Sequence, residues 1–442
     1  MSDSRVDPSA GGELSFAFVG DIFPARPLGA GHGEAFGGIK RLFAGVDVVM
    51  GNSETVYHSY EAPPVPDSGP FGTYAVCPPA VIDDLHDLGV SIVSTANNHC
   101  ADYGEGGVIA NIANLRAHHM PFAGTGATLA EATQATYLGA GPAHSTVALV
   151  ATTLTAPAGD HRAGDPDGIV KGRPGTSVIR HDPIHVVPAD VLDVIGGLGG
   201  DLNLGRFHRR AGNRVRVGGV TFERGDGYET RESLHVGDLQ RTLTAVEDAR
   251  AFADWVVLSV HAHERGESKD YPAPFTVDLA HAAIDKGADV VFCHGPHIDR
   301  GIEIYRGRPI FYALGNFVLH NEVIPHQPPD FAERFEAPAD AGTAAMYDAR
   351  ITNYSGGRGP DPLEYRSVIA TVAFRDGALH RVELHPVDLG EKRSRARRGT
   401  PEMAEEDLGA LILTRLQQIS APYGTRIDIE DGVGVIRLGA TD

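Results

Sequence analysis

The chain has 442 residues, of which 42% are hydrophobic and 22% are charged, a balance typical of globular proteins and unlike that of disordered or fibrous ones. Its formal net charge of −20 argues against a nucleic-acid partner and against binding to an anionic membrane surface. Its apolar runs are shorter than the roughly 18 residues that a spanning helix needs, so we predict no membrane span.

The N-terminal segment and the cysteines indicate the compartment. Residues 1–13 are polar and acidic and lack the basic start and apolar core of a signal peptide, so we predict a disordered lead-in. The chain contains three cysteines, Cys77, Cys100 and Cys293, which are too few and too scattered for a disulfide framework. We therefore predict a cytoplasmic location.

Three short apolar runs in the first hundred residues predict buried strands that end in polar residues. Leu14–Val19 precedes Gly20-Asp21, Val46–Met50 precedes Glu54, and Ser91–Thr95 precedes Asn97-Asn98-His99. Open α/β sheets bind their ligands at the carboxyl ends of the strands. These polar residues are therefore expected at one edge of a sheet.

Helical patterns alternate with these strands, which predicts an α/β fold. In the first half of the chain, helices are expected at Ala80–Leu88 and Val108–His118. Residues 155–240 are rich in Gly, Arg, Asp and His with weak periodicity, and they predict a loop-rich insert.

Regular patterns return after the insert. The expected elements are a helix at Asp238–Ala253, a strand at Trp255–Val260 ending at His261, a helix at Val277–Lys286 and a strand at Asp289–Phe292 ending at Cys293-His294. A hairpin (Ile302–Tyr305, Pro309–Tyr312), a long loop (325–363), an antiparallel pair (Val368–Phe374, Leu379–Pro386) and a helix (Glu402–Ser420) before a final strand pair complete the prediction.

Five strand ends thus present oxygen and imidazole groups, at Asp21, Glu54, Asn98-His99, His261 and His294. This donor set suits a borderline divalent cation such as Mn²⁺, Fe²⁺, Zn²⁺ or Ni²⁺, and the lack of a cysteine pair disfavours a structural zinc site. Three neighbours keep two interpretations each. Asp102 either orients His99 or caps the following helix, while His263 and Glu264 are either part of the site or solvated.

Five stretches of the chain resemble one family. The strings FAFVGDIFPARP, GNSETV, STANNHCADYGEGGV, VLSVHAHERGE and VFCHGPHIDRGIEIYRGRPIFYALGNFV resemble the CapA family of poly-γ-glutamate capsule-synthesis proteins. That family is similar to the calcineurin-like metallophosphoesterases, which implies a four-layer α/β/β/α sandwich. The resemblance covers residues 14–390, with the insert at 155–240, and leaves 391–442 as a C-terminal helix and strands packed on this domain.

The resemblance also implies roles for individual residues. The metal ligands would be Asp21, Glu54, Asn98, His261, His294 and His297, with His99 as the acid/base histidine. The phosphoesterase pattern places a further histidine two residues after the first Asp, where this chain has Phe23. We therefore expect one firmly held ion, with Glu54, Asn98, His261 and His294 as its ligands and Asp21 and His297 in a weakened second position. The pattern leaves Mn, Fe, Zn, Ni, Mg and Ca open.

One metal ion flanked by imidazoles allows more than hydrolysis. A Lewis acid can polarise a carbonyl and acidify the adjacent Cα–H, and bases on opposite faces can then remove and return the proton. The candidate bases are His99, supported by Asp102, together with His263 and His297. Enzymes similar to this family include the lasso-peptide epimerases of the MslH type, which invert the C-terminal residue of a ribosomally made precursor peptide.

Three hypotheses follow from these residues. The leading one is a metal-dependent epimerase, an isomerase of lasso-peptide (RiPP) biosynthesis, whose partner is a peptide such as a leader-bearing precursor. The alternative is a CapA-like hydrolase or phosphoesterase acting on poly-γ-glutamate or on a phosphoester. The third is a binding protein without catalytic activity.

Several residues are candidates for holding the substrate. Asn97, Glu264 and Arg300 lie in the motifs, and Arg300 is a candidate partner for a substrate carboxylate. A basic stretch in the insert either binds an acidic leader or is a solvated face; it comprises Arg206, His208, Arg209, Arg210, Arg214 and Arg216.

Overall fold

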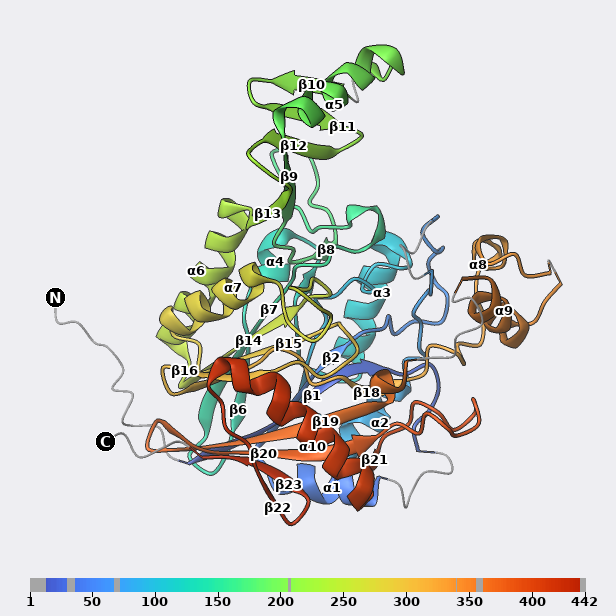
Figure 1. The fold of residues 1–442 in the computed structure, drawn as a ribbon. Coiled ribbons are helices and arrows are strands. Elements are labelled where there is room, and N and C mark those ends of the chain that lie inside the picture. The colour runs from blue at the N-terminus through green and yellow to red at the C-terminus, as the bar shows by residue number, and fades with distance from the viewer. Residues whose placement is uncertain are drawn as a thin grey trace. The chain divides into compact units, whose positions relative to one another are not determined.

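The computed structural model describes residues 13–29, 36–66, 72–205, 208–338, 340–354 and 361–437. The predicted lead-in falls almost entirely on residues 1–12, outside this described part. The chain divides into two compact units, unit 1 (Met1–Val178 and Arg241–Asp442) and unit 2 (Ile179–Gln240). Both units contain helices and strands, so the fold is mixed α/β, as predicted (Figure 1).

A ten-stranded sheet forms one half of unit 1. Its first three strands in the chain, β1, β2 and β3, run parallel to one another, so their carboxyl ends lie at one edge. The main path is β22 (Asp428–Glu430), β23 (Val433–Ile436), β20 (Ala378–Asp388), β19 (Arg366–Arg375), β1 (Leu14–Phe23), β2 (Val48–Ser53), β3 (Ile92–Ser94) and β4 (Phe122–Ala123), with β18 (Asn316–Leu319) beside β1 and β21 (Glu402–Met403) beside β20.

A six-stranded sheet forms the other half. Its strands β7, β14, β15 and β17 are parallel neighbours, so here too the carboxyl ends share an edge. The order is β16 (Ile302–Tyr305), β17 (Arg308–Phe311), β15 (Val290–His294), β14 (Trp255–His261), β7 (Ser145–Thr153) and β6 (Thr136–Ala140). A separate pair joins β5 (Thr125–Gly126) to β8 (Gly175–Thr176).

The two sheets pack face to face through alternate residues of their strands. Side chains of a strand point to opposite faces in turn, and Phe16 and Phe18 of β1 point toward the six-stranded sheet. The Phe18 ring lies 5.3 Å from Phe292 and 5.7 Å from Phe311, and Phe16 lies 6.4 Å from Trp255. This aromatic layer belongs to one buried cluster that contains residues of both sheets, and it fixes the position of one sheet against the other.

Helices cover the outer faces of the sheets. The intervening residues of β1, such as Ala17 and Val19, pack in a second cluster with buried residues of α1 and α2 and with Leu115 of α3. On the other sheet α7 contacts β15. Helix α10 packs on β20 (Figure 1) from the inner side, because its Ile412, Leu413 and Leu416 belong to the same buried cluster as Phe16 and Phe18. The helices of unit 1 in the described residues are α1 (Gly37–Phe43), α2 (Val81–Leu88), α3 (Gly104–Ala117), α4 (Leu129–Thr133), α7 (Pro274–Asp285), α8 (Pro329–Arg334), α9 (Thr343–Ala349) and α10 (Glu406–Ser420), together with α6 (Val236–Phe252) from Arg241 onward.

One predicted loop contains regular structure, and one predicted helix begins later than expected. The segment 325–363, predicted as a long loop, contains α8, α9 and a π-helical turn at Arg350–Tyr354. Its helices are short and buried at few positions, such as Phe331 and Tyr347, so the sequence carries little helical periodicity. The helix predicted at Glu402–Ser420 begins at Glu406 because residues 402–403 form β21.

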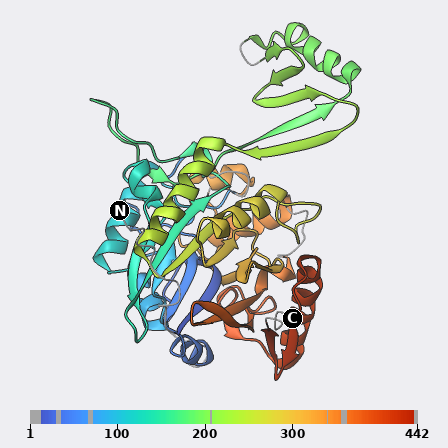
Figure 2. The same cartoon turned by 90° about the vertical axis from the view of Figure 1, so that its left-hand side faces the viewer.

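Unit 2 is a small sheet with one helix, not the loop-rich insert that was predicted. Its order is β10 (His208–Ala211), β11 (Arg214–Val217), β12 (Val220–Arg224), β9 (His181–Val187) and β13 (Glu229–Leu234), and α5 (Ala189–Asp201) packs on it (Figure 2). A core of Val187, Leu192 and Val215 holds the helix to the sheet. Thr155–Val178, part of the predicted insert at 155–240, belong to unit 1.

Candidate metal centre

The centre of the site is a carboxylate at the end of β1. Asp21 is fully buried, and parallel register pairs it with Asn52 of β2 on one side and Asn316 of β18 on the other. The Asn52 amide donates to Oδ1 of Asp21 at 2.8 Å, and the Gly295 backbone N–H donates to Oδ2 at 3.1 Å. These donors fix the carboxylate in one orientation.

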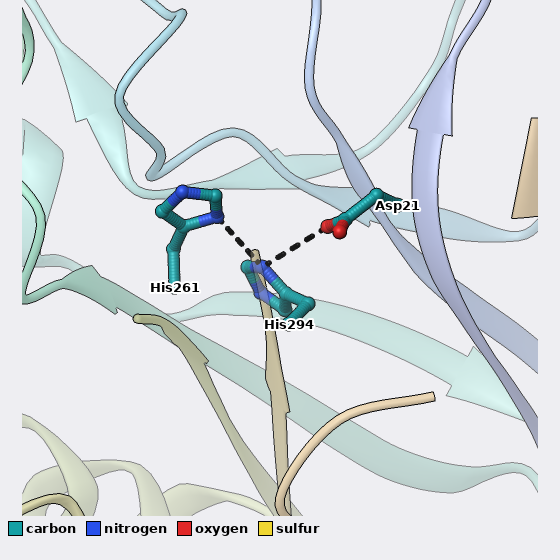
Figure 3. Close-up of side chains that lie close together, drawn as sticks. All are labelled: Asp21, His261 and His294. Carbon is teal, nitrogen blue, oxygen red and sulfur yellow. Dashed lines mark hydrogen bonds and ion pairs between the residues drawn. The ribbon is translucent and has the colours of Figure 1, made fainter. Parts of the chain in front are cut away.

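Two histidines from the other sheet face this carboxylate. Register in β14 and β15 places His261 directly beside His294, and their Nδ1 atoms lie 3.1 Å apart. Nδ1 of His294 lies 3.7 Å from Oδ1 of Asp21, while its Nε2 lies 2.7 Å from the Ser259 hydroxyl. Figure 3 shows the three side chains converging. The Ser259 contact therefore directs the other nitrogen of His294 toward Asp21 and His261.

Glu54 faces Nε2 of His261, whereas His294 faces Nδ1 of the same ring. The Glu54 side chain is fully buried, and its Oε1 is 3.8 Å from Nε2 of His261. Within the described residues, the two carboxylate oxygens of Glu54 and Nε2 of His261 are buried and make no hydrogen bond. Buried polar groups are rarely left this way. Ligand atoms that converge without hydrogen bonds between them could bind a cation.

His297 completes the cluster from a strained backbone position. Its φ is +59°, a value uncommon for residues other than glycine, and Asn316 holds it by contacts to Nδ1 at 2.9 Å and to its carbonyl at 3.1 Å. Nδ1 of His297 lies 3.3 Å from Asp21 and 3.8 Å from Glu54. Strained backbone of this kind is often retained at functional sites.

Charge within the cluster shifts the pKa values in opposite directions. Burial would raise the pKa of Asp21, but the hydrogen bond and charge of His297 hold it at about 2. Burial and the charge of Asp21 raise the pKa of Glu54 well above its usual value. Burial would lower the pKa of His297, but the charges of Glu54 and Asp21 raise it to about 10.

Burial dominates at the other two imidazoles. It lowers the pKa of His294 to about 4, with Asp21 opposing, and it lowers the pKa of His261 well below its usual value, with neighbouring histidines adding to the effect. Both rings are therefore neutral at pH 7, which is the form that binds metal ions.

Three overlapping groups of side chains place their ligand atoms within 4.8 Å of one another: Asp21, His261 and His294; Glu54, His261 and His263; and Asp21, Glu54 and His297. Carboxylates and imidazoles suit a borderline divalent cation. The grouping differs from the predicted one, which set Asp21 apart from His261 and His294. Parallel register between β1, β2 and β18 carries Asp21 into the middle of the cluster, and sequence spacing alone does not show this.

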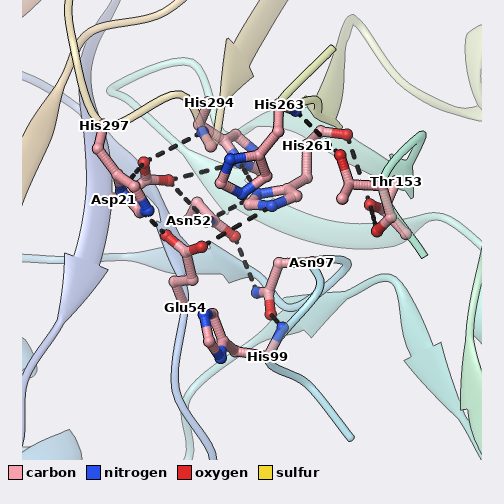
Figure 4. A network of polar contacts seen from close by, with 12 residues as sticks. Asp21, Asn52, Glu54, Asn97, His99, Thr153, His261, His263, His294 and His297 are labelled. Carbon is pink, nitrogen blue, oxygen red and sulfur yellow. Dashed lines mark hydrogen bonds and ion pairs between the residues drawn. The ribbon is translucent and has the colours of Figure 1, made fainter. Parts of the chain in front are cut away.

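His99 lies beside the cluster (Figure 4) and forms a hydrogen-bonded pair with Asp102. Nδ1 of His99 lies 2.7 Å from Oδ2 of Asp102, and the same oxygen accepts the Ala75 backbone N–H. The next helix begins at Gly104 without a side-chain cap. Of the two interpretations of Asp102, the geometry therefore agrees with orientation of His99.

Phe23 stands where the phosphoesterase pattern has a histidine. Its ring meets the His99 ring edge-on at 5.5 Å, so this position contributes packing and no ligand atom. Asn98 and His99 line a cavity of about 110 Å³ together with Phe23, Thr73, His263, His297, Leu319, Asn321, Arg350 and Glu364. Within the described residues, Oδ1 of Asn98 is buried without a hydrogen-bond partner, which is in keeping with the predicted ligand role.

None of the three predicted substrate-binding residues, Asn97, Glu264 and Arg300, is among the described residues that line this cavity. Asn97 donates to the Asn52 side chain and the Ser53 carbonyl and accepts the His99 backbone N–H, so it shapes the turn. Glu264 accepts the Thr155 hydroxyl. Arg300 is 1% exposed and donates to the carbonyls of Lys269, Ala262 and His263; this geometry favours a structural role over the predicted carboxylate binding.

Sequence reasoning missed several supporting residues. Asn52, Ser259 and Asn316 each hold a cluster residue; all three lie in the quoted strings, and Asn52 and Ser259 are one or two residues from a predicted strand end. Arg350 and Glu364 also line the cavity, and no local pattern marks them. The basic stretch forms part of the unit 2 sheet, where Arg210 pairs with Asp193 and Arg214 with Glu223; Arg206 lies outside the described residues.

Two stacked sheets gather carboxylates and imidazoles at their carboxyl edges, and this α/β arrangement could hold a metal ion. A family model described as "Bacterial capsule synthesis protein PGA_cap" matches residues 15–321. The match covers well over half of the chain, so the chain belongs to this family, and the resemblance to the CapA family is confirmed.

Relatives agree with this assignment. The chain is 34% identical over 431 residues to "Uncharacterized protein y4sH" of Sinorhizobium fredii (strain NBRC 101917 / NGR234), which covers 95% of this chain and 92% of the relative. It is 32% identical over 116 residues to "PGA biosynthesis protein CapA" of Bacillus subtilis (strain 168), or 26% of this chain and 30% of that protein. "Capsule biosynthesis protein CapA" of Bacillus anthracis is 37% identical over 81 residues, 18% and 19% of the two chains.

Across the described residues, none of the helices combines the length and the apolar character needed to cross a membrane.

Proposed function

We propose that the protein is a metal-dependent hydrolase that cleaves amide bonds of a poly-γ-glutamate-type polymer. The observation that carries the proposal is the shared cavity: His263 and His297 of the carboxylate and imidazole cluster line it together with His99, which pairs with Asp102. Membership of the capsule-synthesis family and the names of the Bacillus relatives support the substrate class. The fold alone does not determine the reaction.

The architecture supports a fold similar to that of the metallophosphoesterases. Two sheets share a buried aromatic layer, and helices α1 and α2 pack on one outer face while α7 packs on the other sheet. We infer from this arrangement a four-layer α/β/β/α sandwich, in which the insert is unit 2.

The ligands of the metal would be Asp21, Glu54, His261, His294 and His297, with Asn98 and His263 at the border of the cluster. When bound, a divalent cation supplies Lewis acidity toward a carbonyl oxygen. We infer one firmly held ion, because Phe23 contributes no ligand atom and the three groups share their residues. Elemental analysis of the purified protein tests this number, and two ions per chain would contradict it.

His99 would transfer the proton. The Asp102 carboxylate holds Nδ1, so Nε2 is the nitrogen able to exchange a proton with a substrate in the cavity. A positioned histidine gives a leaving amine the proton that it needs, and such general acid catalysis contributes about 10²–10⁴-fold to the rate. Burial raises the pKa of Asp102, and the neighbouring His99 opposes this increase.

The proposal is tested with the metal-loaded protein and poly-γ-glutamate. New amino termini and shorter chains are expected, and His99→Gln should lower the rate by about 10²-fold or more. His118→Gln is the matched control, because His118 pairs with Asp83 outside the cavity. Absence of new amino termini with any of the candidate metals, or cleavage of a chromogenic phosphodiester alone, would contradict the proposal.

A peptide epimerase is the second candidate, and one observation favours it. His99 and His263 line the same cavity but follow strands of different sheets, β3 and β14, so two imidazoles approach it from different elements. His263 lies 5.4 Å from the His297 ring. Incubation of a precursor peptide in D₂O distinguishes the candidates: epimerisation adds deuterium at one Cα and leaves every amide bond intact, whereas hydrolysis cuts the chain.

A further inference from the structure

The lining of the cavity includes a permanent positive charge. Among the described residues that line this cavity, Arg350 is the one arginine or lysine. It reaches the cavity from the π-helical turn Arg350–Tyr354, and π-helical turns occur frequently at functional sites. In a chain with a net charge of −20, a cation at this position favours an anionic group of the substrate.

Contacts with described residues hold the guanidinium group of Arg350 in place. Its Nη1 donates to the Thr73 hydroxyl at 2.8 Å, and Thr73 is itself buried. The group also lies over the Phe335 ring, 5.8 Å from the ring centre. A planar group fixed by a hydroxyl and an aromatic face is oriented before a ligand arrives, which reduces the entropy that binding costs.

Two other residues of the cavity lining favour a carboxylate over a phosphate as the bound anion. Glu364 lines it as well; burial raises the pKa of this carboxyl, and the charges of His297 and Arg350 oppose that increase. A carboxylate in the wall repels a dianionic phosphate more strongly than a singly charged carboxylate. Oδ1 of Asn321 is buried there without a hydrogen-bond partner among the described residues, so it is an acceptor available to a peptide N–H.

We propose that Arg350 binds a carboxylate of the substrate next to the metal cluster and thereby selects carboxylate-bearing peptides. The proposal rests on the proposed function, which defines the substrate. It gives Arg350 the role that the sequence suggested for Arg300. A guanidinium group matches the two oxygens of a carboxylate bidentately. The carboxylate comes either from the glutamate units of a γ-linked chain or from the C-terminus of an α-linked peptide.

Calorimetric binding to the metal-loaded full-length protein tests the proposal, with mass spectrometry to show that each probe stays intact. The probes are tri-γ-glutamate and its α-amide, acetyl-trialanine and its C-terminal amide, and inorganic phosphate. At least one free acid should bind more tightly than its amide, and Arg350→Gln should weaken that acid by about tenfold or more while leaving the amide unchanged. The acid that shows the difference identifies the source of the carboxylate.

Arg334→Gln is the matched control. Arg334 also lies over the Phe335 ring, at 5.9 Å, but it is exposed and does not line the cavity. Its loss should leave every probe unaffected. Arg350→Lys keeps the charge and the apolar stem, so it protects the test against a folding defect; it should weaken the acid less than Arg350→Gln does.

Several outcomes would overturn the proposal. They are equal binding of the free acid by wild type and Arg350→Gln, no preference for acid over amide, and binding of phosphate but neither acid. Because binding is measured without turnover, loss of acid binding in Arg350→Gln with no polymer cleavage by wild type would support Arg350 and contradict only the hydrolase proposal.

Discussion

Glu54 is a carboxylate held in an environment that opposes its charge. Burial and Asp21 raise its pKa, and its oxygens have no hydrogen-bond donor among the described residues. Such a group is costly in the metal-free protein and favourable beside a cation. Glu54 therefore lowers the stability of the metal-free protein and raises its affinity for the metal.

The substitution Glu54→Gln separates these effects. Removing partners of metal ligands costs about 10–100-fold in metal affinity, so loss of a carboxylate ligand should cost about 100-fold or more. The metal-free variant should be at least as stable as wild type, since a neutral amide is easier to bury. Metal titration and chemical denaturation measure the two quantities. Glu264→Gln, which lies outside the three groups, should change neither.

His297 makes metal binding depend on pH. Its pKa of about 10 in the metal-free protein means that the ring is protonated at pH 7, whereas a metal ligand must be neutral. Binding therefore releases this proton, and affinity should rise with pH by about tenfold per unit until pH 10 from this group. Calorimetry in buffers of different ionisation enthalpy counts the protons, and His297→Gln should release about one fewer. An equal count in both proteins would show that His297 does not bind the metal.

The strands' carboxyl ends were the part of the site that the sequence predicted best. Apolar runs ending at Asp21, Glu54, His261 and His294 show where a buried strand stops, because burial and alternation are local properties of the chain. Which ends lie beside each other depends on parallel register, and that is set by contacts between distant segments. This is why the place of Asp21 beside His261 and His294 required the structure.

At the scale of elements, the turn after β15 depends on glycine. Gly295 has φ +108°, and a Cβ there would lie 2.8 Å from the His261 ring, a distance that real Cβ atoms essentially never show. Its backbone N–H also binds Asp21. The turn therefore brings the backbone, His261 and Asp21 within contact of one another.

Gly295→Ala should therefore lower both stability and metal affinity. Gly307→Ala is the matched control, because Gly307 has φ +75° but open space around its Cα. The control should lose about 1–2 kcal/mol from its left-handed backbone, and Gly295→Ala should lose more because the His261 ring must also move. Thermal unfolding and metal titration compare the two variants; equal losses would mean that the turn does not position His261.

Elements without an apolar pattern were missed for a physical reason. The strand β13 is exposed at nearly every position, and β10 at most, so neither shows the alternation that a half-buried strand has. Arg350 lies in a Pro- and Gly-rich segment whose helices are short, and its place in the cavity depends on Thr73, far away in the sequence. Neither feature is a local property of the chain.

At the scale of the whole molecule, every candidate ligand belongs to unit 1. The ends of the chain that lead into and out of unit 2 lie close together, since Nη2 of Arg241 donates to the Val178 carbonyl at 2.9 Å. Segments inserted between neighbouring ends are often removable without loss of the host fold.

Replacement of residues 179–240 by a short Gly–Ser linker should therefore leave metal content unchanged and the unfolding temperature within a few degrees of wild type. Elemental analysis and calorimetry of the shortened protein provide the measurement. Loss of the bound metal, or failure to fold, would show that unit 1 depends on unit 2. A change confined to substrate binding would assign unit 2 to recognition.

The candidate ligands come from both sheets: Asp21 lies near the end of β1 and Glu54 follows β2, while His261 and His294 end β14 and β15. A cation held by all four would make local opening of either sheet edge release it, so its binding free energy would add to the opening free energy of both edges. Amide hydrogen exchange at the ends of β1 and β14 should then slow together, and by the same factor, when the metal is added. The two sheets would behave as one cooperative unit in the metal-bound protein and as two in its absence.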